Sequence, residues 1–344
     1  MSHDPLLSPM PRIIAVLGAG AWGTALAIHL AKAGHQVKLW SHSASQAERL
    51  NEQHENSRYL PGIAFPKSLS VSASLDQVLY SAESVLVVVP SDAFREVLKQ
   101  VSHYVGSKSV HIAWATKGFE PKSQSLLHQV ALEVLGEDFG ISVLSGPTFA
   151  DEVAKGLPTA MVSASPQESE AQYWADVFHF GAFRMYTQSD MVGVEIGGAY
   201  KNIIAIATGL SDGLGLGANA RAALVSRGMV EMMRLGEALG GQPETLMGLA
   251  GLGDLVLTCT DNLSRNRRFG LRLAESNQTA QAVIDEIGQV VEGVKAVIAV
   301  KQIALNLSLD LPIMEQVYQI VTEQSTPKEA AMALLARSGK SEGY

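Results

Sequence analysis

The sequence predicts an α/β domain with a doubly wound sheet, followed by an all-α domain. Up to about residue 188, short apolar and β-branched runs alternate with stretches of helical periodicity. From residue 190 to residue 337 the pattern is helical throughout, interrupted only by glycine and proline. The 344 residues are enough for two domains of roughly 100–200 residues each. A hydrophobic fraction of 47% with only 17% charged residues excludes global disorder, which needs low hydrophobicity and high charge.

The first domain is expected over residues 12–189. We expect its strands at residues 13–17, 36–40, 85–89, 109–114, 141–144, 160–163 and 184–187. We expect its helices at residues 22–33, 44–54, 92–103, 123–135 and 167–178, with a further short helix after residues 145–150. Continuous apolar runs such as residues 85–89 are typical of parallel strands covered on both faces, and the alternation implies right-handed crossovers.

The second domain is expected over residues 190–337, with glycine-rich turns at 212–217 and 248–253. The polar ends, residues 1–11 and 338–344, are expected to fray. The first dozen residues do not have the pattern of a signal peptide. There is also no apolar run of about 18 residues, so we expect no membrane span.

Charge and cysteine content exclude further classes of protein. The formal net charge of −8 argues against nucleic acid and against a polybasic membrane surface as partners. The single cysteine, Cys259, excludes an internal disulfide, which fits a cytoplasmic protein. The nine histidines contain no H-x-x-x-H pair, so we expect no metal site.

A glycine motif, Gly18-x-Gly20-x-x-Gly23, follows the first expected strand and opens the first helix. In a Rossmann-type dinucleotide-binding turn, the first glycine allows a tight turn and the second lets the backbone approach a pyrophosphate. The third lets helix and strand pack closely, and the helix N-terminus adds N–H donors and a positive dipole. We therefore predict a Rossmann-type dinucleotide site; the alternative is a tight turn without a ligand.

The end of the second expected strand bears on the choice of cofactor. Sites specific for NAD usually place an Asp or Glu there to bind the ribose 2′-hydroxyl. Residues 38–43 contain no acidic residue, whereas His42 and the nearby Arg49 could accommodate a 2′-phosphate. We expect NADP(H) to be favoured, with NAD(H) also accepted. The alternative is that His42 is only a solvated loop residue.

Two segments follow strands at the edge where open α/β sheets bind ligands. Lys117 comes directly after the expected strand at 109–114, and residues 145–150 follow the expected strand at 141–144. A lysine in this position beside a cofactor suggests an anionic substrate. The alternative is a solvated surface cation.

Lys201 lies inside a strongly apolar expected helix of the second domain. Burial lowers the pKa of a lysine and makes it suitable for proton transfer. Asp254 is the best candidate for its carboxylate partner, and Thr258 shares the face of Asp254 if that segment is helical. Small residues one turn away would let a ligand approach the ammonium; these are Gly197, Gly198 and Ala205. The alternative is a structural Lys–Asp pair.

Residues 264–268, Ser-Arg-Asn-Arg-Arg, form the most basic short run of an acidic chain. Arginine binds phosphate oxygens through two parallel hydrogen bonds, so this run could close over a substrate phosphate. The alternative is a solvated helix face.

These segments resemble the NAD(P)-dependent sn-glycerol-3-phosphate dehydrogenase family in its bacterial form. The resemblance spans roughly residues 12–335, and its motifs include GAGAWGTALA at 18–27 and GLAGLGDLVLTCTDNLSRNRRFG at 248–270. The other matching stretches are residues 115–120, 144–160, 200–224 and 290–293. Tyr200 departs from the family's common Leu-Lys-Asn pattern and is expected to be tolerated.

The resemblance implies reversible reduction of dihydroxyacetone phosphate to sn-glycerol 3-phosphate, which feeds glycerophospholipid synthesis. It implies that Lys201 is the catalytic general acid/base, that Asp254 and Thr258 assist it, and that Lys117 orients the substrate. The implied substrate contacts also include Gly146, Thr148, Asn202, Ser264, Arg265 and Asn266. The implied cofactor contacts, besides the three motif glycines, are Ala21, Trp22, His42, Lys117, Ala150, Arg265, Val290 and Glu292.

Two other functions remain open at this point. A related two-domain dehydrogenase of a β-hydroxyacid or a sugar acid could use Lys117 and Arg265 to hold a carboxylate. A cofactor-binding sensor without turnover would have no need of a buried proton donor, which makes Lys201 an argument against it. The sequence does not determine the oligomeric state, and a homodimer is one of the states left open.

Overall fold

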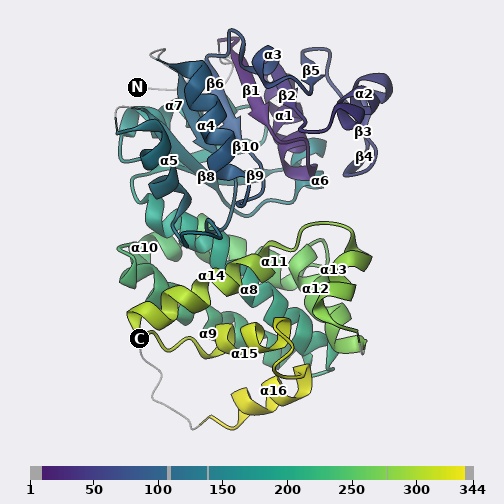
Figure 1. Ribbon diagram of the computed structural model, residues 1–344, viewed down its shortest axis with the longest axis vertical. Helices are drawn as coiled ribbons and strands as arrows, with labels where there is room; N and C mark the ends of the chain where they lie inside the picture. Colours follow the sequence, from purple (N-terminus) through teal and green to yellow (C-terminus); the bar gives the residue numbers. More distant parts are fainter. Residues whose placement is uncertain (1–9, 107–109, 138, 277, 338–344) are drawn as a thin grey trace. The chain divides into compact units, whose positions relative to one another are not determined.

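The computed structural model describes residues 10–106, 110–137, 139–276 and 278–337. The chain divides into two compact units. The first contains Met1–Thr116 and His128–Met191, and the second contains Lys117–Leu127 and Val192–Tyr344. Of the two tails expected from the sequence, only Met10 and Pro11 fall within the described residues. In Figure 1 the strands and their helices run from purple to teal, and the helices of the second unit run from teal to yellow.

The first unit contains an eight-stranded sheet in the order β10-β9-β8-β7-β6-β1-β2-β5. Seven of these strands match expected ones to within two residues at each end: β1 (Ile13–Leu17), β2 (Gln36–Trp40), β6 (Ser84–Val87), β7 (His111–Trp114), β8 (Ile141–Ser145), β9 (Thr159–Ala164) and β10 (Phe183–Gln188). The first residue of the expected strand at 109–114 lies outside the described residues. The strands β3 (Glu55–Asn56), β4 (Leu60–Ala64) and β5 (Leu69–Ser72) were not expected. They are short, and β4 contains Pro61 and Gly62, which weaken a strand pattern.

One pair of strands departs from the expected parallel arrangement. The central pairs are parallel, but β9 runs antiparallel to β8, with Leu144 opposite Ser163. The connection between them holds only the six-residue helix α6 (Ala150–Lys155). A helix of this length rises about 9 Å, whereas a five-residue strand extends about 17 Å. A six-residue helix does not span the length of the neighbouring strand, which fits the antiparallel direction of β9.

Helices cover both faces of this sheet. Alternate residues of β1, Ile14 and Val16, pack in one apolar cluster with residues of α1 (Ala21–Lys32), α6 and α7 (Glu168–Phe178). On β7, Trp114 packs edge-on against Phe94 of α4 (Phe94–Val105). The remaining helices of the unit are α2 (Ala44–Gln53), α3 (Leu75–Leu79) and α5 (Leu127–Leu135), the last of which begins in the second unit's segment. The predicted doubly wound α/β fold is thus confirmed.

The second unit is helical from Val192 onward in the described part of the chain. Its helices are α8 (Met191–Gly213), α9 (Gly217–Ala238), α10 (Pro243–Leu246), α11 (Asp254–Thr260), α12 (Arg265–Glu275), α13 (Ala280–Ile287), α14 (Glu292–Leu307), α15 (Pro312–Val321) and α16 (Pro327–Leu335). The expectation of a glycine-rich turn at 248–253 is wrong, because η1 (Leu249–Gly253) is a turn of π-helix that leads into α11. At 212–217 the turn is shorter than expected, because α8 continues to Gly213.

Glycines let α8 and α12 cross with their backbones in contact. A Cβ at Gly209 of α8 would lie 2.0 Å from the carbonyl oxygen of Arg267, and a Cβ at Gly270 of α12 would lie 2.1 Å from that of Ile206. Since real Cβ atoms do not approach so closely, any other residue would force the helices apart. The crossing brings the basic run at the start of α12 close to the middle of α8.

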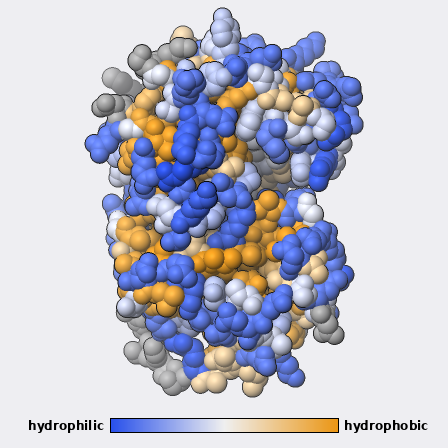
Figure 2. All heavy atoms as spheres, viewed as in Figure 1, coloured by the Kyte–Doolittle hydropathy of each residue, from blue (hydrophilic) through white to orange (hydrophobic). Residues whose placement is uncertain are grey.

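Part of the surface of the second unit is apolar. Figure 2 shows apolar side chains gathered where α14 is drawn in Figure 1, and Ile298, Leu305 and Leu307 of that helix are all exposed. Among the described helices, none combines the length and the hydropathy needed to span a bilayer.

Candidate functional site

The glycine loop of the first unit can be built only from glycine at two of its positions. Gly18 adopts a φ of +125°, and a Cβ there would lie 2.5 Å from the carbonyl oxygen of Val88. A Cβ at Gly23 would lie 1.9 Å from the carbonyl oxygen of Gly18. At Gly20, in contrast, a Cβ would meet no atom within 4 Å. The loop is therefore tightly packed against the sheet on one side and open above Gly20.

This open space is lined by unused hydrogen-bond donors. Gly20 is the N-cap of α1 and has no side chain to cap it, and the first turn of α1 contains no acidic residue. The indole N–H of Trp22 is buried without a hydrogen-bond partner among the described residues. An uncapped helix N-terminus attracts anions through its free N–H groups and its dipole. The loop and the first turn of α1 therefore fit the pyrophosphate of a dinucleotide.

The end of β2 borders this loop, since the N–H of Gly18 donates to the carbonyl oxygen of Trp40 over 3.1 Å. His42 follows in an exposed bend, and Arg49 is exposed on α2. Both predicted cofactor-selecting residues are thus solvent-accessible and lie close in sequence to the end of this strand.

The predicted residues after β8 form a second turn in the first unit. Gly146 has a φ of +153°, and a Cβ there would lie 2.9 Å from the carbonyl oxygen of Ala160, so glycine is needed here as well. The hydroxyl of Thr148 donates to the carbonyl oxygen of Gly146 over 3.2 Å. Ala150, which opens α6, is partly exposed.

In the second unit, one carboxylate joins two lysines. Nζ of Lys201 on α8 donates to Oδ1 of Asp254 over 2.5 Å and to Oγ1 of Thr258 over 3.0 Å. Nζ of Lys117 donates to the other oxygen, Oδ2, over 2.7 Å. Asp254 and Thr258 share one face of α11, and Asp254 has no solvent exposure at all. We call Lys117, Lys201, Asp254 and Thr258 the lysine cluster.

Within this cluster, burial shifts the pKa of Lys201. It lowers the pKa of Lys201 to about 8, the nearby charge of Asp254 acts in the opposite direction, and Lys117 lowers the pKa further. A group that titrates near neutral pH is suited to give and to take a proton. The arrangement can therefore supply a proton donor to an oxygen atom placed beside Nζ of Lys201.

The sequence suggested that the small residues around Lys201 leave room for a ligand. In the structure, not all of them do. A Cβ at Gly197 would lie 2.4 Å from the carbonyl oxygen of Ala250, so the backbone of η1 occupies this space. Ala205 belongs to the apolar core of the unit and has no solvent exposure. The absence of a side chain at Gly197 instead lets η1 approach α8, and Asp254 is the residue that directly follows η1.

The predicted phosphate-binding residues lie at the start of α12 and next to α8. The hydroxyl of Ser264 caps α12 by accepting from the N–H of Arg267 over 3.3 Å. Nδ2 of Asn266 donates to Oδ1 of Asn202 over 2.9 Å, and Oδ1 of Asn266 accepts from the N–H of Gly293 over the same distance. These contacts bring α8, α12 and the start of α14 together.

The arginines of the basic run have different surroundings. Arg265 is partly exposed, and its guanidinium donates to the carbonyl oxygen of Val290 over 3.4 Å, next to the partly buried Glu292 at the start of α14. Arg267 is buried and donates to the carbonyl oxygen of Cys259 over 3.1 Å, with further contacts to Asn262 and Asp212. Arg268 is exposed. The sequence contained no signal to distinguish Arg267, a packing residue, from its neighbours.

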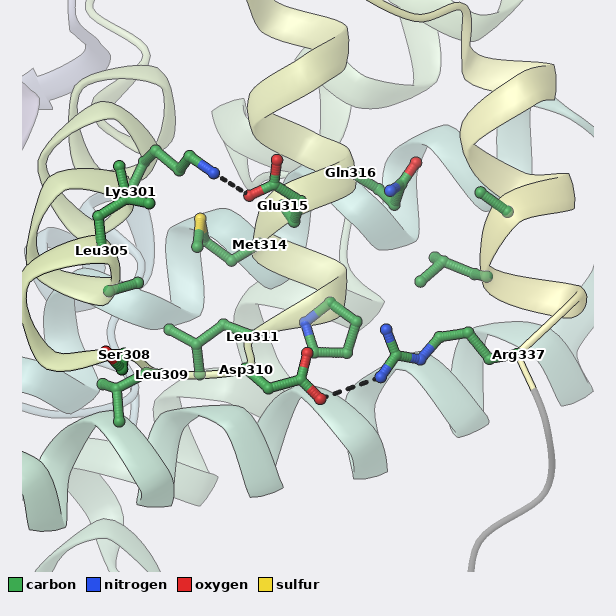
Figure 3. A pocket seen from close by; sticks show the side chains of 14 residues that line it. Lys301, Leu305, Ser308, Leu309, Asp310, Leu311, Met314, Glu315, Gln316 and Arg337 are labelled. Carbon is green, nitrogen blue, oxygen red and sulfur yellow. Dashed lines mark hydrogen bonds and ion pairs between the residues drawn. The ribbon is translucent and has the colours of Figure 1, made fainter.

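A cavity of about 370 Å³ lies in another part of the second unit, between α14, α15 and α16 (Figure 3). Its charged side chains pair with one another: Lys301 contacts Glu315 over 2.5 Å and Arg337 contacts Asp310 over 3.0 Å. None of the residues predicted from the sequence lines it. Within the described ranges, no group of three His, Cys, Asp or Glu side chains is arranged to hold a metal ion.

Two profiles of one family match the chain. The N-terminal domain of NAD-dependent glycerol-3-phosphate dehydrogenase matches residues 13–171, and its C-terminal domain matches residues 190–332. The chain belongs to this family. It is therefore an oxidoreductase that uses a nicotinamide cofactor, as the resemblance predicted.

Relatives within the family match over nearly the whole chain. A glycerol-3-phosphate dehydrogenase (NAD(P)+) of Hydrogenovibrio crunogenus is 66% identical over 334 residues, covering 96% of this chain and 97% of the relative. That of Pseudoalteromonas translucida is 50% identical and covers 98% of this chain and 100% of the relative. The crystal structure of the glycerol-3-phosphate dehydrogenase of Coxiella burnetii is 46% identical, with a TM-score of 0.92, covering 96% of this chain and 100% of that one.

Proposed function

We propose that this chain catalyses the reversible reduction of dihydroxyacetone phosphate to sn-glycerol 3-phosphate, with Lys201 as general acid/base. The observation that carries the proposal is the buried contact of Lys201 with Asp254 and Thr258, together with a pKa of about 8 for the lysine. The activity in the names of relatives that match almost the whole chain supports the same substrate pair.

In the proposed mechanism the nicotinamide cofactor, when bound, supplies the hydride to the carbonyl carbon. Nζ of Lys201 gives its proton to the carbonyl oxygen, and in the reverse direction the neutral amine takes the proton of the hydroxyl. Asp254 stabilises the ammonium form and, with Thr258, holds Nζ in place. Lys117 holds the second oxygen of Asp254 and adds positive charge that favours an anionic substrate.

We place the substrate phosphate at the start of α12. Arg265 is the proposed phosphate ligand, because it is partly exposed at the start of α12 and a guanidinium can bind phosphate oxygens through two parallel hydrogen bonds. Asn202, Asn266 and Ser264 would complete this end, and Gly146 and Thr148 remain proposed substrate contacts. The proposed cofactor contacts are unchanged from those that the resemblance implies: Gly18, Gly20, Ala21, Trp22, Gly23, His42, Lys117, Ala150, Arg265, Val290 and Glu292.

For the cofactor we propose that NADP(H) is favoured and that NAD(H) is also accepted. Residues 38–43 contain no acidic side chain to bind a ribose 2′-hydroxyl, and His42 is exposed at the end of β2. Steady-state assays with dihydroxyacetone phosphate, with β-hydroxyacids and with sugar acids, each with both cofactors, test substrate and cofactor together. We expect turnover with dihydroxyacetone phosphate and a higher kcat/KM with NADPH. Oxidation of an acid without reduction of dihydroxyacetone phosphate would favour the related dehydrogenase, and no turnover would favour the sensor.

Two arginines of the basic run provide a matched test of the phosphate site. Arg265→Ala is expected to raise the KM for dihydroxyacetone phosphate by roughly 10–100-fold, since a hydrogen bond to a charged group contributes about 1.5–3 kcal/mol. Arg268→Ala removes the same charge from the same helix at an exposed position and is expected to leave KM within about twofold. Equal effects of the two substitutions would remove Arg265 from the site.

We further propose a cytoplasmic location, a role in supplying glycerophospholipid synthesis, and a homodimer. The exposed apolar residues Ile298, Leu305 and Leu307 of α14 support the homodimer, since such surfaces often mark protein interfaces. Sedimentation velocity at micromolar concentration would show a dimer, and a monomer at all concentrations would contradict it.

A further inference from the structure

One carbonyl group in the middle of the glycine loop accepts two side-chain hydrogen bonds. Nε2 of Gln46 donates to the carbonyl oxygen of Ala19 over 2.9 Å, and Nδ2 of Asn56 donates to the same oxygen over 3.1 Å. Neither amide belongs to the loop, because Gln46 lies on α2 and Asn56 on β3. Neither was among the residues predicted from the sequence.

Further contacts hold both amides in position. Asn56 is 1% exposed, and its Nδ2 also donates to the hydroxyl of Thr24 in α1 over 2.8 Å. Oε1 of Gln46 accepts from the hydroxyl of Ser41 over 2.8 Å, at the end of β2. The two side chains therefore connect the Ala19 carbonyl to the first helix and to the second strand.

Because of the geometry of the peptide bond, the contacts that fix the Ala19 carbonyl also fix the direction of the Gly20 N–H. The peptide unit is planar and trans, so its carbonyl oxygen and the following N–H point in opposite directions. When the Ala19 oxygen is held towards Gln46 and Asn56, the N–H of Gly20 must point away from them. Gly20 is exposed, and the space beside its Cα is empty within 4 Å of a built Cβ.

We propose that Gln46 and Asn56 are positioning residues that hold the Ala19 carbonyl and thereby aim the Gly20 N–H at the cofactor's pyrophosphate. The proposal rests on the dinucleotide site proposed above and adds to it the groups that fix its backbone donor. Since NADH and NADPH share the pyrophosphate, loss of either amide weakens the binding of both cofactors by the same factor. A residue that acted on the ribose 2′-position would change their ratio instead.

The test measures cofactor binding by isothermal titration of the whole protein with NADPH and with NADH. Gln46→Met and Asn56→Leu remove one amide each with little change in volume. Each is expected to raise both Kd values about fivefold, the usual effect of one hydrogen bond. Since two effects of this size multiply, the double variant is expected to bind both cofactors about 25-fold more weakly. The kcat at saturating NADPH is expected to stay within about twofold, since the lysine cluster is untouched.

Asn51→Leu is the matched control. Nδ2 of Asn51, also on α2, donates over 2.9 Å to the carbonyl oxygen of Val71, which lies on β5 and not in the glycine loop. We expect the Kd values of Asn51→Leu for both cofactors to match those of the wild type. Thermal unfolding is followed for every variant, to check that each one folds. If Asn56→Leu does not fold, Gln46→Met still decides the matter, because Gln46 is only partly buried.

Three outcomes would overturn the inference. The proposal is wrong if the wild type binds both cofactors and Gln46→Met binds them as tightly. It is also wrong if Asn51→Leu weakens binding as much, since the effect would then belong to α2 in general. A wild type that binds neither cofactor would overturn the dinucleotide site itself, and with it the proposed positioning role of Gln46 and Asn56.

Discussion

The glycine loop of the first unit and the lysine cluster of the second offer ligands different chemical groups. The loop is six consecutive residues, Gly18 to Gly23, that present backbone N–H donors. The cluster consists of side chains from segments far apart, since Lys117 and Asp254 are separated by 137 positions and Lys201 and Asp254 by 53. The stability of a tight backbone turn is sensitive to the volume of its side chains. The energy of a buried group of charges depends instead on the number and sign of those charges. Substitutions that change volume and charge separately can therefore test this difference.

The largest effect is expected in the lysine cluster. Lys201→Ala removes the proton donor and should lower kcat by about 10²–10⁴-fold. Lys201→Arg keeps the positive charge but not the proton transfer, since arginine stays protonated, and should be nearly as inactive. Titration calorimetry should show NADPH binding to both variants as to the wild type. Near-normal turnover of either variant would refute the role of Lys201.

In the glycine loop, we expect added side-chain volume to lower both the stability of the fold and the affinity for NADPH. Gly23→Ala places a Cβ 1.9 Å from the carbonyl oxygen of Gly18, so either the loop or α1 must move. We expect a free energy of unfolding lower by about 1–3 kcal/mol, the usual cost of overpacking, and more than tenfold weaker NADPH binding.

Gly20→Ala separates folding from binding at the same loop. Its Cβ would meet no protein atom within 4 Å, so the unfolding free energy should hardly change. NADPH binding should still weaken, because the added methyl group enters the space proposed for the pyrophosphate. Unchanged affinity would show that the ligand does not approach Gly20.

The pH dependence of both directions should reveal the titration of Lys201. Reduction needs the protonated lysine, so its kcat/KM should fall about tenfold per pH unit above the pKa of about 8. Oxidation needs the neutral lysine, so its kcat/KM should rise up to the same pH. Since Asp254 raises the pKa of Lys201, Asp254→Asn should move both curves to lower pH. Curves that stay in place would show that Asp254 does not govern this pKa.

The smallest effect is expected at Tyr200, the residue that departs from the family pattern. Its hydroxyl donates over 2.7 Å to Oε2 of Glu231, and burial raises the pKa of both groups, that of Glu231 to about 7. Tyr200→Phe should lower the free energy of unfolding by about 1 kcal/mol, measured in urea, with little change in kcat. The exposed Tyr186→Phe is the control and should have no effect. An equal loss in both would mean that the buried contact does not stabilise the fold.

Residues close together in the sequence were predicted well. The strand-turn-helix pattern around Gly18, Gly20 and Gly23, and the helical spacing of Asp254 and Thr258, agree with the structure. Contacts between distant segments were predicted less well. The pairing of Lys201 with Asp254 was foreseen because a buried lysine needs a carboxylate, but Lys117 on the second oxygen was not.

What the sequence determined by itself is the local conformation: apolar periodicity, glycine positions and the nearby charge pattern specify strands, helices and the dinucleotide turn. The tertiary structure decided which segments meet. In it, β9 runs antiparallel to β8 and residues 117–127 pack with the helical unit. The space at Gly197 is occupied by η1 rather than left for a ligand. The tertiary structure also brought Gln46 and Asn56 to the Ala19 carbonyl. The reason is that backbone sterics and periodicity act over a few residues, whereas burial of apolar faces and satisfaction of buried polar groups depend on the whole chain.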